Sequence, residues 1–220
     1  MRLVLFDVDG TLTVSQSIDT VLYARSLSEV FGFENVDTDW SVYRHTSDIG
    51  ILQELFVTRL NREPAAAEIE AFRNHFVQAI DAAAAVQPFE EIKGAKRVLA
   101  HLRSLPTHRI GFATGGWSTS AQRKLKSAGL HFDGLPFASS DDAAARTDIM
   151  RIAIERAGMR PTDSIVYIGD AVWDARACRE LQIPFIGIGA GDDARRLIEE
   201  GARAVFADYS DLPRFCAMLD

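Results

Sequence analysis

The sequence predicts an α/β fold: a doubly wound parallel β-sheet with helices on both faces, into which a block of helices is inserted. Two features predict it. Short apolar runs recur along most of the chain, separated by helical patterns of roughly 10–15 residues, the alternation typical of parallel sheets. Residues 14–87 are the exception, because helical patterns follow one another there without a strand-like run between them.

The composition is that of an ordinary globular protein, and it argues against several classes of function. Of the 220 residues, 47% are hydrophobic and 25% are charged, and the formal net charge is −7. This acidic balance, without a basic stripe, gives no support for a nucleic-acid partner. No apolar run approaches the roughly 20 residues that span a bilayer, and the stretch MRLVLFDVDG turns acidic too early for a secretion signal. We therefore expect a cytoplasmic protein without a membrane partner. The sequence carries no signal of its oligomeric state.

The first predicted strand, Leu3–Val8, is an apolar run that ends in acidic residues and glycine. Helices are expected between the later strands, with Ser118 or Thr119 capping one of them and Thr147 capping another. The later apolar runs that predict the rest of the sheet are Ile110–Ala113, the weaker Leu135–Ala138, Ile165–Ile168, Phe185–Ile188 and Ala204–Ala207.

Only helical patterns make up the inserted block, and Gln87–Pro88 is the expected hinge at which the chain returns to the sheet. We therefore predict an α/β core of residues 1–13 and 88–220, with a helical domain of residues 14–87 inserted into it. The helical patterns of the insertion span Thr20–Phe31, Ser47–Leu60 and Pro64–Ala85.

Polar residues follow the ends of four predicted strands. Because ligands bind outside the carboxyl ends of the strands in an open parallel sheet, we expect these residues to share one crevice. Together they supply carboxylates, a hydroxyl beside a glycine turn, and a cation, which is the set that phosphoryl transfer requires. They are Asp7 and Asp9; Thr114, Gly115 and Gly116; Arg146; and Asp170 with Asp174.

The charges in this set suggest the roles. A phosphate dianion repels a carboxylate nucleophile, so attack by Asp7 requires a divalent cation, and Mg²⁺ favours oxygen ligands. Asp7 and Asp170 are suited to supply carboxylates, and Asp9 its main-chain carbonyl. Asp174, close to a helix start, would cap the helix or hold a metal-bound water. Attack would form an aspartyl-phosphate on Asp7, and Asp9 would act as general acid and then as general base.

Phosphate binding is expected from the neighbouring strand end. Thr114 and the amides of Gly115 and Gly116 would bind phosphate oxygens at the start of the following helix. Arg146 would balance the charge that spreads over the phosphoryl oxygens.

Three motifs resemble those of the haloacid dehalogenase-like hydrolase superfamily. DVDGTLT (Asp7–Thr13) resembles its first motif, FATGG, which ends at Gly116, its second, and GDAVWD (Gly169–Asp174) its fourth. The resemblance covers essentially the whole chain and implies a Rossmann-like core. The inserted helices are similar to the cap of phosphoglycolate phosphatases and β-phosphoglucomutases, and a cap that covers the crevice implies a small phosphorylated metabolite as substrate.

The resemblance also implies roles for individual residues. Asp7 would be nucleophile and Mg²⁺ ligand, and Asp9 would be acid/base and carbonyl ligand. Asp170 would be a further metal ligand, and Thr114 would bind phosphate.

The chain departs from the family pattern at the third motif, which usually contributes a lysine. No lysine follows Leu130, so Arg146, which opens the pattern RTDIM, is the favoured substitute. Lys124 and Lys126, on the preceding helix, are the alternatives. A second departure is Val14, where phosphoglycolate phosphatases often carry an aspartate, and this weakens assignment to that one activity.

A phosphatase is the favoured function. Asp9 and Asp170 argue against a dehalogenase, and the absence of lysine from residues 14–87 argues against an imine-forming phosphonatase. A mutase of the β-phosphoglucomutase type remains open, because it uses the same aspartates and the same metal. The alternative from another class is a non-catalytic protein that binds a phosphate ligand or regulates a partner.

Arg44, in the segment YRHTSD of the insertion, is a candidate for substrate specificity. It would bind a carboxylate or a hydroxyl of the substrate when the helices close over the crevice. A solvated charge at a helix entry is the alternative interpretation.

Overall fold

The computed structural model describes residues 1–160 and 162–219. Its strands form one parallel sheet in the order β3-β2-β1-β4-β5-β6, with the first strand of the chain near the middle. This confirms the predicted fold class, an α/β core with a doubly wound sheet. The strands are β1 (Arg2–Phe6), β2 (His108–Ala113), β3 (Phe137–Ala138), β4 (Ser164–Gly169), β5 (Phe185–Ile188) and β6 (Ala204–Phe206).

Both faces of the sheet are covered, and the alternation along β1 decides which side chain enters which layer. Leu3 and Leu5 pack in the cluster that contains α6, α7 and α8. Val4 and Phe6 point the other way, into the cluster with α4, α5 and α9. All four side chains are fully buried, as expected for a central strand of a parallel sheet. The covering helices are α4 (Ala95–Ser104), α5 (Ser118–Ser127), α6 (Arg146–Arg156), α7 (Val172–Leu181), α8 (Gly191–Glu199) and α9 (Leu212–Ala217).

The register of the three central strands brings their carboxyl ends to one level. Phe6 of β1 pairs with Phe112 of β2 on one side and with Ile168 of β4 on the other. Each of these partners lies one or two residues before a polar strand end. The sheet therefore places the segments after β1, β2 and β4 side by side at one edge.

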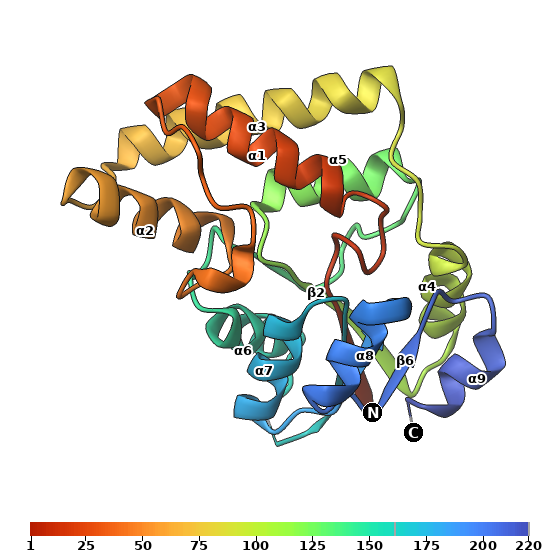
Figure 1. Cartoon of the computed structure of the whole chain (residues 1–220). Helices are drawn as coiled ribbons and strands as arrows, with labels where there is room; N and C mark the ends of the chain where they lie inside the picture. The colour runs from red at the N-terminus through yellow and green to blue at the C-terminus, as the bar shows by residue number, and fades with distance from the viewer. Residues whose placement is uncertain (161, 220) are drawn as a thin grey trace.

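The described part of residues 14–87 contains helices and no strand, and these helices lie beyond the carboxyl edge of the sheet, opposite the N-terminus (Figure 1). Their own core is aromatic: the Tyr23 ring meets the edges of Phe72 and Phe76 at centroid distances of 5.0 and 5.4 Å. This core is continuous with the apolar layer on one face of the sheet. The exact domain boundaries stay a prediction. The elements are α1 (Gln16–Phe31), the 3₁₀ turn η1 (Trp40–Val42), α2 (Asp48–Leu60) and α3 (Ala66–Val86).

The predicted helix caps at Ser118 or Thr119 and at Thr147 are wrong. α5 begins at Ser118, and α6 begins at Arg146, one residue before Thr147; neither helix has a side-chain cap from its own N-cap residue. At α5 the first N–H groups are instead satisfied by acceptors distant in sequence. The Trp117 N–H donates to Asp48 and the Ser118 N–H to Asp141, both at 2.7 Å. Among the described residues, no helix is both long and apolar enough to cross a membrane.

Candidate active site

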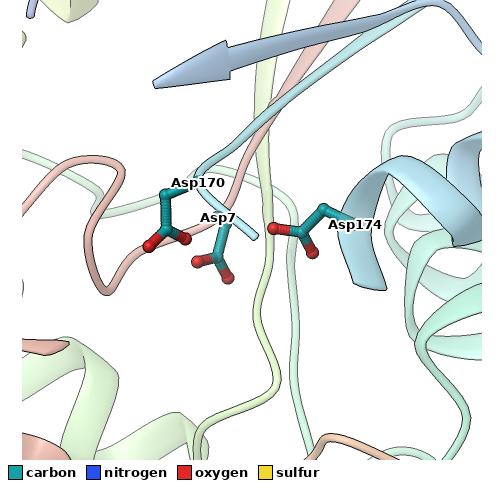
Figure 2. Close-up of side chains that lie close together, drawn as sticks. All are labelled: Asp7, Asp170 and Asp174. Atoms are coloured by element: carbon teal, nitrogen blue, oxygen red, sulfur yellow. The ribbon is translucent and has the colours of Figure 1, made fainter. Parts of the chain in front are cut away.

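Three carboxylates meet at the carboxyl edge of the sheet. Asp7 directly follows β1, Asp170 directly follows β4, and Asp174 lies in the first turn of α7. One oxygen from each lies within 4.8 Å of the other two, and Figure 2 shows the three side chains converging. The structure thus brings together three of the acidic residues that the sequence singled out. We call Asp7, Asp170 and Asp174, together with Arg146, the core cluster.

Two glycines make room for this approach. Gly10 has a φ of +72°, which favours glycine, and a Cβ there would overlap the Asp170 carboxylate. A Cβ at Gly169 would overlap the carboxylate of Asp174. The glycines of DVDGT and GDAVWD are therefore required by the packing of the acidic side chains.

The core cluster has more negative charge than its positive group can balance. Burial raises the pKa of Asp7 to about 7, opposed by Arg146 and reinforced by Asp174 and Asp9. Burial, and then the Asp7 charge, raises the pKa of Asp170 well above its usual range. Asp174 Oδ2 is buried without a hydrogen-bond partner. Three oxygen donors, one of them unpartnered, fit a hard divalent cation such as Mg²⁺.

Arg146 is the positive group of the core cluster. It is the first residue of α6 rather than a loop residue, and its side chain is 9% exposed. Its Nε donates to Asp174 at 2.7 Å and its Nη2 to Asp7 at 3.1 Å. Its Nη1 has no partner, and a Cβ built on Gly115 would lie 2.8 Å from it. An unsatisfied, buried guanidinium N–H therefore points toward the glycine turn after β2.

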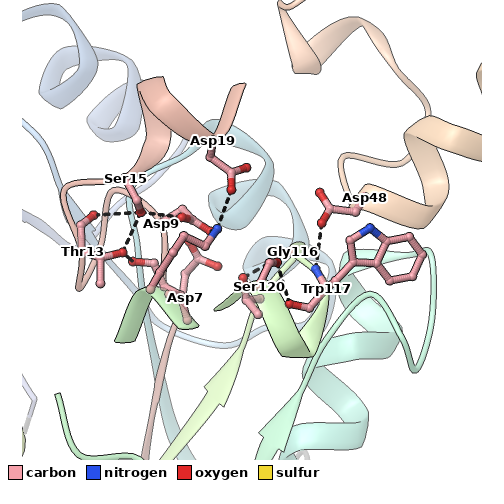
Figure 3. A network of polar contacts seen from close by, with 12 residues as sticks. Asp7, Asp9, Thr13, Ser15, Asp19, Asp48, Gly116, Trp117 and Ser120 are labelled. Atoms are coloured by element: carbon pink, nitrogen blue, oxygen red, sulfur yellow. Dashed lines mark hydrogen bonds and ion pairs between the residues drawn. The ribbon is translucent and has the colours of Figure 1, made fainter. Parts of the chain in front are cut away.

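A second group of charges joins the core to the inserted helices (Figure 3). Lys124 of α5 is fully buried, and its Nζ lies 2.7 Å from Asp9 and 2.5 Å from Asp19 of α1. Burial alone would lower the pKa of Lys124, but Asp19 and Asp9 raise it above its ordinary value. Burial raises the pKa of Asp19 to about 6, although Lys124 opposes the shift. We call Asp9, Asp19 and Lys124 the bridging cluster.

Both oxygens of Asp9 are engaged. Ser15 donates to Oδ1, while Lys124 donates to Oδ2. Ser15 is in turn 2.7 Å from the hydroxyl of Thr13. Of the two lysines considered for the third motif, Lys124 therefore reaches the site, whereas Lys126 is exposed.

Asp48 ties the inserted helices to the strand end after β2. Its N–H donates to the Gly115 carbonyl at 2.8 Å, and its Oδ2 accepts from the Trp117 N–H. The Tyr23 hydroxyl donates to the Asp48 carbonyl at 2.5 Å. Burial, and then Asp19, raises the pKa of Asp48 well above its usual range. Sequence reasoning missed Asp19 and Asp48, because each looks like an ordinary acidic residue in the first turn of a helix.

A cavity of about 70 Å³ lies between the sheet edge and the inserted helices. Asp7, Asp9, Thr114 and Gly115 line it, together with residues of the insertion. Thr114 is buried, and its hydroxyl accepts from the Gly116 N–H at 3.3 Å.

Arg44 lies outside this cavity. It is exposed and lines a neighbouring cavity of about 330 Å³, which shares Thr46, Arg146 and Trp173 with the first. Its N–H donates to Glu54. Contact between Arg44 and a substrate stays a prediction.

Comparisons with known proteins bear on the family and on the fold. Residues 1–182 match the family model of the haloacid dehalogenase-like hydrolases. CbbY from Rhodobacter sphaeroides, in complex with phosphate, shares the fold with a TM-score of 0.74 and 18% identity, over 96% of this chain and 95% of its own. A putative β-phosphoglucomutase from Bacteroides vulgatus has a TM-score of 0.71 and 18% identity, over 100% and 88%. A predicted phosphoglycolate phosphatase from Haemophilus somnus 129pt has a TM-score of 0.68 and 15% identity, over 97% of each chain. No curated protein sequence matches the chain.

Proposed function

The chain belongs to the haloacid dehalogenase-like hydrolases, and on this premise we propose that it is a Mg²⁺-dependent phosphatase acting on a small phosphorylated metabolite. The observation that carries the proposal is the core cluster, three buried or half-buried carboxylates with a single arginine among them. A carboxylate nucleophile, a deficit of positive charge and an unsatisfied guanidinium N–H are together what attack on a phosphate ester needs.

Magnesium fits the donors at this edge of the sheet. Asp7 and Asp170 would hold it with their carboxylates, Asp9 with its main-chain carbonyl, and Asp174 would support it from α7. When bound, the ion would reduce the repulsion between the Asp7 carboxylate and the phosphate oxygens.

The reaction has two displacement steps at phosphorus. An Asp7 carboxylate oxygen attacks the phosphorus, the ester P–O bond breaks, and Asp9 gives a proton to the departing alcohol oxygen. Asp9 then takes a proton from a water molecule as that water attacks the aspartyl-phosphate. The P–O bond to Asp7 breaks, and inorganic phosphate leaves. General acid–base help from a positioned carboxylate is worth roughly 10²–10⁴-fold in rate.

Arg146 is proposed to bind the phosphate. Its free Nη1 and the Gly115 backbone face the same space, and Thr114 lies beside them in the cavity lining. Lys124 takes a different part, since it contacts Asp9 rather than Asp7. The cavity of about 70 Å³ corresponds to about two water molecules at the roughly 30 Å³ that each takes up in the liquid. A small phosphate ester would fill this space.

Hydrolysis of p-nitrophenyl phosphate with and without Mg²⁺ tests the proposal. We expect turnover only with the metal, and a loss of at least about 10³-fold in kcat for Asp7→Asn, because the nucleophile is removed. Asp133→Asn, an exposed aspartate away from the site, is the matched control and should retain wild-type activity. Metal-independent turnover, or full activity of Asp7→Asn, would contradict the mechanism.

A screen of phosphorylated metabolites in Mg²⁺ separates the alternatives. The same aspartates would serve a phosphomutase of the β-phosphoglucomutase type, which would turn over a sugar phosphate only with a bisphosphate primer. A folded protein that turns over no phosphate ester would instead be a binding or regulatory protein.

A further inference from the structure

The two halves of the central cavity differ in charge. The half at Arg146 is the part of the cavity proposed to bind the phosphate, because the buried, unpartnered Nη1 of Arg146 points toward Gly115. Of the described residues that line the cavity, Arg146 is the only lysine or arginine. The half lined by the inserted helices therefore faces the leaving group of a bound ester, and it offers that group no cation. This half presents carboxylates, hydroxyls, an amide and an aromatic ring, from Asp19, Asp48, Thr20, Thr46, Gln16 and Trp40.

The nearest cation behind this half, Lys124, already has two carboxylate partners. Lys124 is fully buried and bonded to Asp9 and Asp19, so it offsets part of their charge without entering the cavity lining. Asp48 has no cationic partner among the described ion pairs. One of its oxygens accepts from the Trp117 N–H. Burial, which raises the pKa of Asp48 well above its usual range, favours the uncharged form of that carboxyl. The negative charge that faces the leaving group therefore comes from Asp9 and Asp19, whose two charges exceed the one that Lys124 supplies.

Two wider spaces adjoin the cavity, and they differ in charge. One, of about 630 Å³, shares Thr20 and Trp40 with the first cavity; Arg196 is its only cation among the described residues, set against several carboxylates. The other, of about 330 Å³, carries Arg44 and Arg176. A leaving group therefore meets acidic surroundings as long as it stays in the central cavity or extends into the larger of these spaces.

We propose that the leaving group of the natural substrate carries no negative charge: the substrate is the monophosphate of an uncharged, hydroxyl-bearing alcohol, and esters that bear a carboxylate or a second phosphate are rejected. This rests on the proposed phosphatase function and names the substrate class of the same site. An ionised carboxylate only accepts hydrogen bonds, so Asp19 suits the hydroxyl donors of a polyol, and the oxygens of Asp48 can accept from them as well. A carboxylate on the substrate would instead add like-charge repulsion against Asp9 and Asp19 in a water-poor cavity, where such repulsion is costly.

Two pairs of esters that differ only at the leaving group test this. The pairs are glycerol 3-phosphate with 3-phosphoglycerate, and 2-hydroxyethyl phosphate with phosphoglycolate. For each ester we would measure kcat/KM with Mg²⁺, and Ki against p-nitrophenyl phosphate, which reports binding even without turnover. The hydroxyl member should be favoured at least about tenfold in both pairs, because a like charge is costly at short range. Equal values within a pair, or a preference for the acid, would overturn the inference. Failure of p-nitrophenyl phosphate hydrolysis itself would instead remove the phosphatase function and this inference with it.

A variant locates the cause of the discrimination. Asp19→Asn removes one of the repelling charges but keeps an oxygen that can accept from the Lys124 ammonium group. The preference for the hydroxyl member should therefore shrink by at least about threefold. Asp141→Asn is the matched control, because it removes an acidic side chain that lies outside the cavity lining. An unchanged preference in Asp19→Asn, or an equal reduction in both variants, would show that the acidic half does not select the substrate.

Discussion

The core cluster and the bridging cluster lie side by side but differ in charge balance and in what they join. Three carboxylates face one arginine in the core cluster, and all its members come from the sheet and its own helices. Two carboxylates face one lysine in the bridging cluster, which links α5 of the core to α1 of the insertion. The core cluster has a buried carboxylate oxygen without a hydrogen-bond partner, whereas the lysine of the bridging cluster donates to both of its carboxylates. We infer that the core cluster is arranged to receive a cation, whereas the bridging cluster holds the inserted helices against the core.

Asp170→Asn tests the core cluster, and among the variants that compare the two clusters it should lower activity most. It removes a proposed metal ligand while keeping the side-chain shape, so we expect kcat/KM to fall at least about 100-fold and the Mg²⁺ concentration for half activity to rise. The measurement is a Mg²⁺ titration of activity. Wild-type Mg²⁺ dependence in this variant would mean that the core cluster is not a metal site.

Mg²⁺ should also stabilise the core cluster in a pH-dependent way. In the folded protein the pKa of Asp7 is raised from 3.8 to about 7. The free energy of unfolding of the metal-free protein therefore falls as pH rises through this range and the Asp7 carboxyl ionises. Binding of Mg²⁺ to the ionised carboxylates reverses that cost and contributes about 2.7 kcal/mol at 100 times Kd. Thermal unfolding should therefore show a gain in Tm on adding Mg²⁺ that is larger at pH 8 than at pH 5.5.

Asp170→Asn serves as the control for that measurement and should lose most of the gain at pH 8. A gain that is larger at pH 5.5, or the same in the variant, would place Mg²⁺ binding elsewhere.

Lys124→Met probes the bridging cluster, where stability rather than metal binding should respond. It leaves Asp9 and Asp19 without their cation, and since both carboxylates are mostly buried we expect a loss of about 3–5 kcal/mol in the free energy of unfolding. Lys126→Met, two residues along the same helix and exposed, should change it by no more than about 0.5 kcal/mol. Chemical denaturation without metal measures both. Equal losses in the two variants would mean that the bridging cluster contributes no more than a surface lysine.

The two clusters also differ in how far sequence could predict them. Asp7, Asp170 and Asp174 were found because each closely follows an apolar run, and a parallel sheet must bring the ends of such runs to one edge. Asp19 and Asp48 were missed because their approach depends on how α1 and α2 dock on the core. Helical periodicity identifies the apolar face of a helix but not the residue that it meets.

The same reason explains the errors at helix starts and at the third motif. The sequence predicts caps at Ser118 or Thr119 and at Thr147, but the amides at the start of α5 donate to Asp48 and Asp141, which are distant in the chain. The sequence offers Arg146, Lys124 and Lys126 as alternatives for the cation of the third motif. The structure brings two of them to the site, Arg146 to the core cluster and Lys124 to the bridging cluster. The catalytic roles themselves stay predictions.

Thr114 lines the same cavity as members of both clusters, and its substitution should have the smallest effect. Its hydroxyl already accepts the Gly116 N–H, so it helps to shape the turn as well as to contact phosphate. Thr114→Val keeps the side-chain volume but removes the hydroxyl, and should lower kcat/KM by about tenfold, the value of roughly one hydrogen bond to a charged group. Thr114→Ser restores the hydroxyl and should recover most of the loss. Wild-type kcat/KM in Thr114→Val would show that the hydroxyl is not needed. The turn after β2 would then serve to position Gly115 and Arg146, and Thr114 would not bind phosphate.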